Sequence, residues 1–247
     1  MAQLSDDCFA FGGPLMSAAD ALARLHERLS IVAEPEEIAL GRGHGRILAE
    51  DVVAPRSVPP HDNAAVDGYA VFFDDLAPGA ETRLAVAGRA SAGHPLGRAG
   101  RRGEAIRVFT GAPMPEGPDT VFMQEDCRVD GGSIILPSGI RCGANRRHAG
   151  EDVKAGSTIL RSSQRLRPQD VGLAASIGRT TLRVYRPLRV ALMSTGDEIR
   201  DIGEELPPGC VYDANRYALA GLLEGIGCVV DDIGIIPDRR DAMREAL

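Results

Sequence analysis

Residues 188–198 read LRVALMSTGDE, and this stretch decides the fold of the C-terminal part of the chain. Its first six residues form an apolar run with one arginine, the pattern of a strand covered on both faces. A helix is predicted at residues 215–226, where leucines recur at helical spacing before Gly227. Cys228–Ile236 follows as a second strand, and Pro237 opens another helix. This β-α-β-α alternation predicts a parallel sheet in an α/β domain.

The preceding part of the chain has shorter elements. A capping pattern that begins at Ser17 predicts a helix over residues 18–30. A second helix is predicted at residues 168–177, because Pro168 suits a first helical position and Gly178 a stop. Between Arg46 and Arg183, short apolar runs separated by Gly and Pro predict a strand-rich region. The runs are Leu84–Gly88, Ala105–Phe109, Thr120–Gln124, Ser133–Leu136, Thr158–Leu160 and Thr181–Tyr185.

Length and composition limit the class of protein. At 247 residues, with 44% hydrophobic and 26% charged residues, the chain should fold as one large domain or as two to three small ones. Two strands and a short helix bury little surface, so we expect residues 186–247 to be the first part of a larger α/β domain and the chain to be a fragment.

Charge and cysteine content exclude several partners. A net charge of −7, a pI near 5.3 and the absence of Trp disfavour a nucleic-acid binder. Five cysteines without a C-x-x-C pair predict neither a disulfide framework nor a zinc site. The first basic residue is Arg24, and no apolar run approaches the ~20 residues of a membrane span. We therefore expect a cytoplasmic protein with no nucleic-acid or membrane partner.

Three loops in the strand-rich region carry polar residues suited to chemistry. The loop at 59–71 presents Asp62 and Asp67 behind two stiffening prolines, with an ordinary Asx turn as the alternative. Thr110 begins the TGAPMPEG loop, whose prolines could hold its hydroxyl in place for a ligand. Residues 143–152 join two arginines and a histidine to two carboxylates, which suits an oxyanion or a metal but equally a solvated charged turn.

The most specific polar segment follows the apolar strand. Ser194–Glu198 stands at the carboxyl end of that strand, where open α/β sheets bind ligands. Hydroxyls there can grip phosphate, and a carboxylate can position Mg²⁺ or take a proton. Asp213 and Asn215 start the next helix, either as plain N-caps or as part of a phosphate site. The histidines lack metal-ligand spacing, and no G-x-S-x-G, P-loop or dinucleotide motif occurs.

Five collinear segments together resemble the MoeA family of molybdopterin molybdenumtransferases, to which the gephyrin E domain is related. They are PPHDNAAVDGYAV, TGAPMPEGPDTVFMQED, GANRRHAGEDVKAG, RVALMSTGDEI and VYDANRYALAGLLEGIGCVVDDIGIIPD. The resemblance implies a multi-domain α+β fold: a discontinuous domain at 14–55 and 143–185, an inserted β-rich domain at 56–142, and an incomplete α/β molybdopterin-binding domain at 186–247. A C-terminal β-barrel domain of the family would be absent.

The resemblance also implies a reaction and its residues. Molybdate is inserted into adenylylated molybdopterin with release of AMP and support from Mg²⁺. Asp67, Asp152 and Glu198 are carried over as catalytic, and Glu198 also as the metal ligand. The substrate-binding residues carried over are Thr110, Ser194, Thr195, Asp213 and Asn215. The implied assembly is an elongated homodimer whose site lies between the β-rich domain of one subunit and the α/β domain of the other.

Two differences from the family pattern matter. Ala64 stands where many relatives have Ser, which removes one hydroxyl. The sequence also ends before the family's GGxS and PGNP-like loops, so we expect little or no insertase activity from these 247 residues alone. A non-catalytic dimerisation or scaffold module and a general Mg²⁺-dependent nucleotide hydrolase are the alternatives. The family further implies molybdopterin adenylyltransferase and molybdoenzyme acceptors as partners.

Overall fold

The computed structural model describes residues 16–246, in two compact units that divide after Glu34. The first unit contains helix α1 (Ala18–Arg28). The Ser17 side chain accepts a hydrogen bond from the Asp20 amide at 3.1 Å, which caps the first turn. The predicted helix at 18–30 is confirmed, but it ends earlier because Leu29 has extended backbone angles. None of the helix residues is buried.

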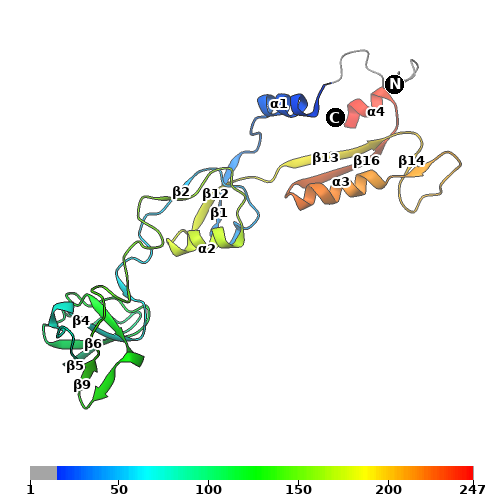
Figure 1. The fold of residues 1–247 in the computed structure, drawn as a ribbon. Coiled ribbons are helices and arrows are strands. Elements are labelled where there is room, and N and C mark those ends of the chain that lie inside the picture. Colours follow the sequence, from blue (N-terminus) through cyan, green and yellow to red (C-terminus); the bar gives the residue numbers. More distant parts are fainter. Residues whose placement is uncertain (1–15, 247) are drawn as a thin grey trace. The chain divides into compact units, whose positions relative to one another are not determined.

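A curled six-stranded sheet forms the β-rich part of the second unit (Figure 1). Its spatial order is β7-β4-β6-β5-β9-β8, and only β5 and β6 run parallel to each other. The strands are β4 (Gly68–Val71), β5 (Thr82–Ala90), β6 (Glu104–Val108), β7 (Thr120–Met123), β8 (Arg128–Asp130) and β9 (Ser133–Leu136). The short 3-10 helices η2 (Phe73–Asp75) and η3 (Gln124–Asp126) follow β4 and β7.

Both faces of this sheet are covered by apolar side chains. Strand β4 is buried along its whole length, with Tyr69 and Val71 in one cluster and Ala70 in the other. Such alternation is what a strand buried on both faces requires. The loops at the end of the sheet are joined by β3 (Asn63–Ala64) and β10 (Arg146–Arg147), which pair antiparallel.

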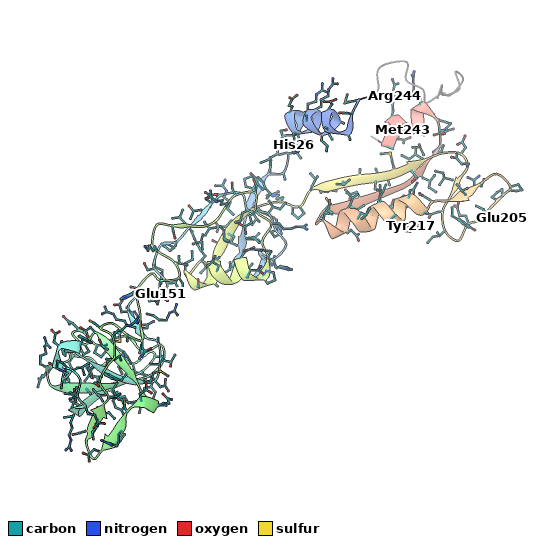
Figure 2. The ribbon with its side chains drawn as sticks, viewed as in Figure 1. His26, Glu151, Glu205, Tyr217, Met243 and Arg244 are labelled. Atoms are coloured by element: carbon teal, nitrogen blue, oxygen red, sulfur yellow. The ribbon has the colours of Figure 1, made fainter. Side chains whose placement is uncertain are left out.

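Strands β13 (Arg189–Thr195) and β16 (Val229–Ile236) pair in parallel and confirm the predicted β-α-β unit. Helix α3 (Ala214–Gly225) contacts both strands, and α4 (Arg240–Ala246) contacts β16 (Figure 1). Figure 2 shows the side chains here, with Tyr217 on α3 and Met243 and Arg244 on α4. A second parallel pair joins β14 (Ile199–Arg200) to β15 (Val211–Tyr212). The expectation that the first strand is covered on both faces is wrong, because β13 has no buried residue: one strand and one helix cannot enclose it.

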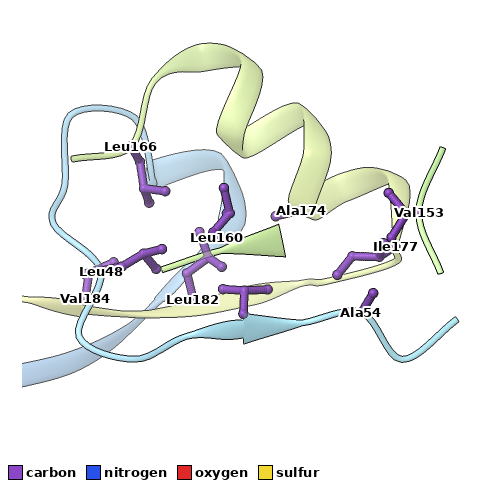
Figure 3. Packing of buried hydrophobic residues seen from close by; sticks show 10 residues of the cluster. Leu48, Ala54, Val153, Leu160, Leu166, Ala174, Ile177, Leu182 and Val184 are labelled. Carbon is purple, nitrogen blue, oxygen red and sulfur yellow. The ribbon is translucent and has the colours of Figure 1, made fainter. Parts of the chain in front are cut away.

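The remaining elements surround one hydrophobic core (Figure 3). Strand β1 (Pro35–Ala39) pairs antiparallel with β12 (Thr181–Tyr185), and β2 (Val52–Val53) pairs with β11 (Thr158–Leu160). Helix α2 (Pro168–Ser176) and the 3-10 helix η1 (Leu40–Arg42) complete this part. The buried residues are Leu48, Val52, Ala54, Val153, Leu160, Leu166, Ala174, Ile177, Leu182 and Val184.

The α+β class and the six predicted strand runs are therefore confirmed, and so is the helix at 168–177 within one residue of its end. The domain boundaries given above stay predictions. Within residues 16–246, no helix is long and apolar enough to cross a membrane.

Candidate functional site

Asp67 and Thr110 meet at one end of the six-stranded sheet. Asp67 precedes β4 and Thr110 follows β6, and these strands pair antiparallel with Gly68 opposite Val108. The Thr110 amide and hydroxyl both donate to the same Asp67 carboxylate oxygen, each at 2.8 Å. The amide bond first, then the hydroxyl bond, lowers the pKa of Asp67 below its ordinary value. The predicted pair thus forms an ionised, half-buried carboxylate that the exposed Thr110 holds in one orientation.

The glycine after Asp67 is required by the sheet. A Cβ at Gly68 would lie 1.7 Å from the carbonyl oxygen of Phe122 on β7. Gly111, directly after Thr110, has φ +79°, a conformation that favours glycine. The glycines that follow Asp67 and Thr110 are therefore both required by the backbone.

Asp62, the other aspartate of the 59–71 loop, fastens that loop in place. Its carboxylate accepts from the Ala149 amide at 2.7 Å and from Arg146 Nε at 2.6 Å. The Ala149 bond and then the Arg146 contacts lower the pKa of Asp62, against the opposing effect of burial. Its oxygens are used within the protein, so Asp67 is the aspartate of this loop that remains open to a ligand.

Asp152 lies in a charged turn, where Glu151 is labelled in Figure 2. Arg147 donates to the Asp152 carboxylate at 2.6 Å, and Glu151 accepts from the His148 amide at 3.1 Å. The Asp152 bond raises the pKa of Arg147. These contacts match the alternative of a solvated charged turn, and a catalytic role for Asp152 rests on the family resemblance.

The carboxyl ends of the parallel strands present a second set of polar groups. Ser194 is half-buried, whereas Thr195, Glu198 and Asn215 are exposed. At the end of β16, the Asp238 amide donates to the Asp197 carboxylate at 3.4 Å. Sequence reasoning missed Asp238, although the strand-end rule that singled out Ser194–Glu198 applies equally to Cys228–Ile236.

Asp213 is the N-cap of α3 and is buried. It accepts from the Arg216 amide at 3.1 Å and from Arg216 Nε at 2.9 Å. Burial opposes its ionisation, but hydrogen bonds from Ser194 and Arg216 hold the pKa of Asp213 below its ordinary value. Ser194 and Asp213, two of the predicted strand-end residues, are therefore neighbours.

Arg216 is the centre of this strand-end network and was not predicted. Its guanidinium is 4% exposed and binds Asp213, Asp232 and, at 2.7 Å, Asp201. The Asp232 bond and then the Asp213 bond raise the pKa of Arg216. Arg216 thereby ties the start of α3 to β16 and to the loop after β14. Its only sequence signal is an arginine at helical position three, which is too common to identify such a network.

The carboxylate donors suit Mg²⁺ in kind, although the described residues contain no cluster of three or more His, Cys, Asp or Glu side chains placed for a metal. The Glu198 carboxylate folds over Gly196, where an added Cβ would lie 2.7 Å from Glu198 Oε2. Mg²⁺ is usually bound by one or two carboxylates together with substrate phosphates and water. Glu198, with Asp197 beside it, fits that pattern.

The predicted site residues thus form three groups: Asp67 with Thr110, Asp152 with Arg147, and the strand-end residues Ser194 to Asn215. Within residues 16–246, no hydrogen bond or ion pair connects one group with another. Their convergence on one substrate stays a prediction.

Comparison with known proteins decides the family. A model of the MoeA N-terminal region, covering its domains I and II, matches residues 16–178. The chain belongs to the MoeA family. A second model, described as a probable molybdopterin binding domain, matches residues 191–247. The second match includes every strand-end residue described above.

Named relatives agree with this MoeA assignment. The chain is 37% identical over 233 residues to a molybdopterin molybdenumtransferase of Haemophilus influenzae, covering 94% of this chain and 57% of the relative. It is 34% identical to a molybdopterin molybdenumtransferase of Nostoc, covering 93% of this chain and 53% of that one. A crystal structure of the MoeA protein of Pyrococcus horikoshii matches with a TM-score of 0.85 at 32% identity, covering 92% of this chain and 62% of that one. The chain spans a little over half the length of these relatives.

Proposed function

We propose that the protein acts in molybdenum cofactor biosynthesis, inserting molybdate into adenylylated molybdopterin with release of AMP. The observation that carries this proposal is the strand-end group. Hydroxyls of Ser194 and Thr195, the carboxylate of Glu198 and the exposed start of α3 gather at the carboxyl ends of two parallel strands. That location favours an anionic ligand, and the molybdopterin-binding model covers it.

Each part of this chain has a role in the proposal. Ser194, Thr195 and Asn215 bind the pterin phosphate or the nucleotide, and Asp213 positions Ser194 and the start of α3. Asp67 orients water at the phosphoanhydride, and Thr110 both holds Asp67 and contacts an oxyanion. Asp152 contributes a further carboxylate.

Magnesium is part of the same proposal. Glu198 would hold the ion, with Asp197 beside it. When bound, Mg²⁺ neutralises phosphate charge in the reacting phosphoanhydride. The protein's contribution is to keep carboxylate oxygens, rather than nitrogen or sulfur ligands, at this point.

The proposed assembly is a cytoplasmic homodimer in which the site lies between subunits. Helix α1 and the residue after it support a dimer, because Leu22, Leu25 and Leu29 are 58%, 54% and 72% exposed. A second copy of the chain would cover this apolar stripe, as expected for a self-complementary interface. Molybdopterin adenylyltransferase and molybdoenzymes would supply the substrate and receive the product. The same stripe also favours the second candidate, a dimerisation or scaffold module without activity.

AMP release tests the proposal. The polypeptide encoded by the whole reading frame that contains these residues is mixed with adenylylated molybdopterin, molybdate and Mg²⁺. Insertion predicts AMP release that requires all three additions. Release of nucleotide products from ATP without pterin would instead identify a general hydrolase, and a stable dimer without any AMP release would favour the scaffold.

A further inference from the structure

Two arginines stack on one phenylalanine beside the Asp67–Thr110 pair. Arg89 on β5 and Arg107 on β6 stand directly opposite each other in the parallel pairing of these strands. Their guanidinium carbons lie 4.6 and 4.7 Å from the centre of the Phe109 ring. Arg107 also lies 5.0 Å from the ring centre of Tyr69, its register partner on β4. Cation–π contacts with these rings hold both guanidiniums at the sheet surface.

The protein balances only part of the charge of this pair, because the charge of Arg107 is near enough to the Asp67 carboxylate to help lower the pKa of that group. Across the described residues, no hydrogen bond or ion pair connects Arg89 with a carboxylate. Arg107 donates to the Gly68 carbonyl at 3.3 Å and to the amide oxygen of Gln124, both uncharged acceptors. Like charges placed directly opposite each other on a sheet destabilise it. Two cations that face each other beside a single carboxylate leave a net positive charge, which is suited to an anionic ligand.

Four other arginines of the same sheet region are each paired with a carboxylate. The pairs are Arg83 with Asp130, Arg98 with Glu104, Arg102 with Asp75 and Arg128 with Glu81. Unpaired arginine is therefore not a general property of this surface. Among the described residues, Arg101 in the loop before β6 also makes no ion pair, but Arg89 and Arg107 are the two that face each other where β5 and β6 end.

The surroundings of the pair form the rest of a site. Thr110 is one residue beyond Phe109, and its amide fixes the Asp67 carboxylate. The loop after β5 lies alongside, since Ala92 Cβ is 3.9 Å from the position of a Cβ on Gly111. Two cations, a hydroxyl and one ionised carboxylate therefore occupy a single end of the sheet.

We propose that Arg89 and Arg107 form an oxyanion subsite that binds the phosphate oxygens of the substrate. Arginine presents planar, paired donors that match phosphate oxygens, and ring stacking reduces the freedom that binding must remove. The identity of the substrate rests on the proposed function, whereas binding of phosphate oxygens does not. Molybdate presents the same tetrahedral arrangement of oxygens, so the experiment compares binding of pyrophosphate with binding of molybdate.

The test uses the 247-residue chain, inorganic pyrophosphate and calorimetric titration at low ionic strength, where charge contacts are least screened. Arg89→Gln should weaken pyrophosphate binding about tenfold, the effect of losing one charge-assisted contact. Arg83→Gln is the matched control, because it removes the same charge from the same strand at an exposed ion pair. The affinity of Arg83→Gln for pyrophosphate should stay within about twofold of the wild-type affinity. Arg89→Lys should recover part of the loss, since it restores charge without the paired donors.

Two outcomes would overturn the subsite, and a third would change its ligand. Absence of measurable pyrophosphate binding by the wild type, or equal weakening by Arg89→Gln and Arg83→Gln, would leave only unspecific charge attraction. Molybdate binding that is tighter than pyrophosphate binding and lost in Arg89→Gln would replace phosphate by molybdate as the ligand. AMP release by the whole-frame protein is measured separately. A protein that binds pyrophosphate through Arg89 but never releases AMP keeps this subsite and loses the proposed function.

Discussion

Replacing Gly68 by alanine should separate strands β4 and β7 and break the hydrogen bonds between Asp67 and Thr110. The added Cβ would lie 1.7 Å from the Phe122 carbonyl oxygen and 2.8 Å from its carbonyl carbon. Ordinary contact would need β4 and β7 to separate by more than about 1 Å. Because both strands belong to the buried sheet, the clash falls on backbone and cannot be relieved by a side-chain rotation.

The expected cost follows from two effects. Overpacking of a core usually costs ~1–3 kcal/mol, and a buried backbone hydrogen bond left unmade adds ~1–3 kcal/mol. We expect a loss of about 3–5 kcal/mol in the free energy of opening of β4 and β7. A domain of this size is stable by only ~5–15 kcal/mol, so the β-rich part would become marginal.

Hydrogen–deuterium exchange measures this locally. Amides of residues 68–71 and 120–123 should lose protection in Gly68→Ala, and the Thr110 amide should lose its bond to Asp67. Gly132→Ala is the control, because nothing lies within 4 Å of its Cβ position. The control should stay within about 0.5 kcal/mol of wild type. Equal protection of β4 in Gly68→Ala and wild type would show that the reasoning about Gly68 is wrong.

Two further predictions concern buried charges. The Arg167 side-chain hydrogen bond lowers the pKa of Asp170 to about 2 from 3.8. This hydrogen bond contributes to the free energy of unfolding above about pH 4, and the contribution is lost as the pH falls toward 2. The change is about 1 kcal/mol after discounting for the exposed Arg167 side chain. Hydrogen exchange of the α2 amides, measured between pH 5 and 2, should show this loss of stability. In Asp170→Asn the stability of α2 should depend less on pH; the same pH dependence in the variant and the wild type would contradict the assignment. Arg216→Met should cost about 3–5 kcal/mol near pH 7 by leaving buried Asp213 unpaired, and less at acid pH, whereas Arg189→Met, at an exposed pair, should cost about 0–1 kcal/mol. Similar exchange of α3 amides in the two variants would refute the role given to Arg216.

Local sequence signals located most of the elements. Pro168 and Gly178 bracket α2, and apolar runs gave Ser133–Leu136 and Thr181–Tyr185 with their bounds. Such features depend on residues close together in the chain, so periodicity and turn chemistry suffice. The two-residue strand pairs were missed, because four residues carry no readable pattern.

The candidate site was predictable only in part. Thr110 and Asp67 were each singled out, but their hydrogen bonds depend on the pairing of β4 with β6. The same limit applies to Arg89 and Arg107, which become neighbours only through the register of β5 and β6. Strand register sets which residues face each other, and a single sequence does not specify it.

The exposure of β13 has a different origin. Its apolar composition predicts two covered faces, whereas one partner strand and α3 cover part of it. Apolar content reports the tendency of a strand to be buried, and the number of neighbours decides how far that tendency is met.

The central claim is that carboxylates from two parts of the chain act together across a subunit interface. Mixing Asp67→Ala and Glu198→Ala forms of the whole-frame protein tests it most directly, with AMP release as the readout and dimer formation checked by light scattering. Each variant alone should be inactive, and a re-equilibrated equal mixture should recover about a quarter of wild-type activity, because half the dimers then contain one intact site. Two active variants, or a mixture that remains inactive although mixed dimers form, would contradict the claim.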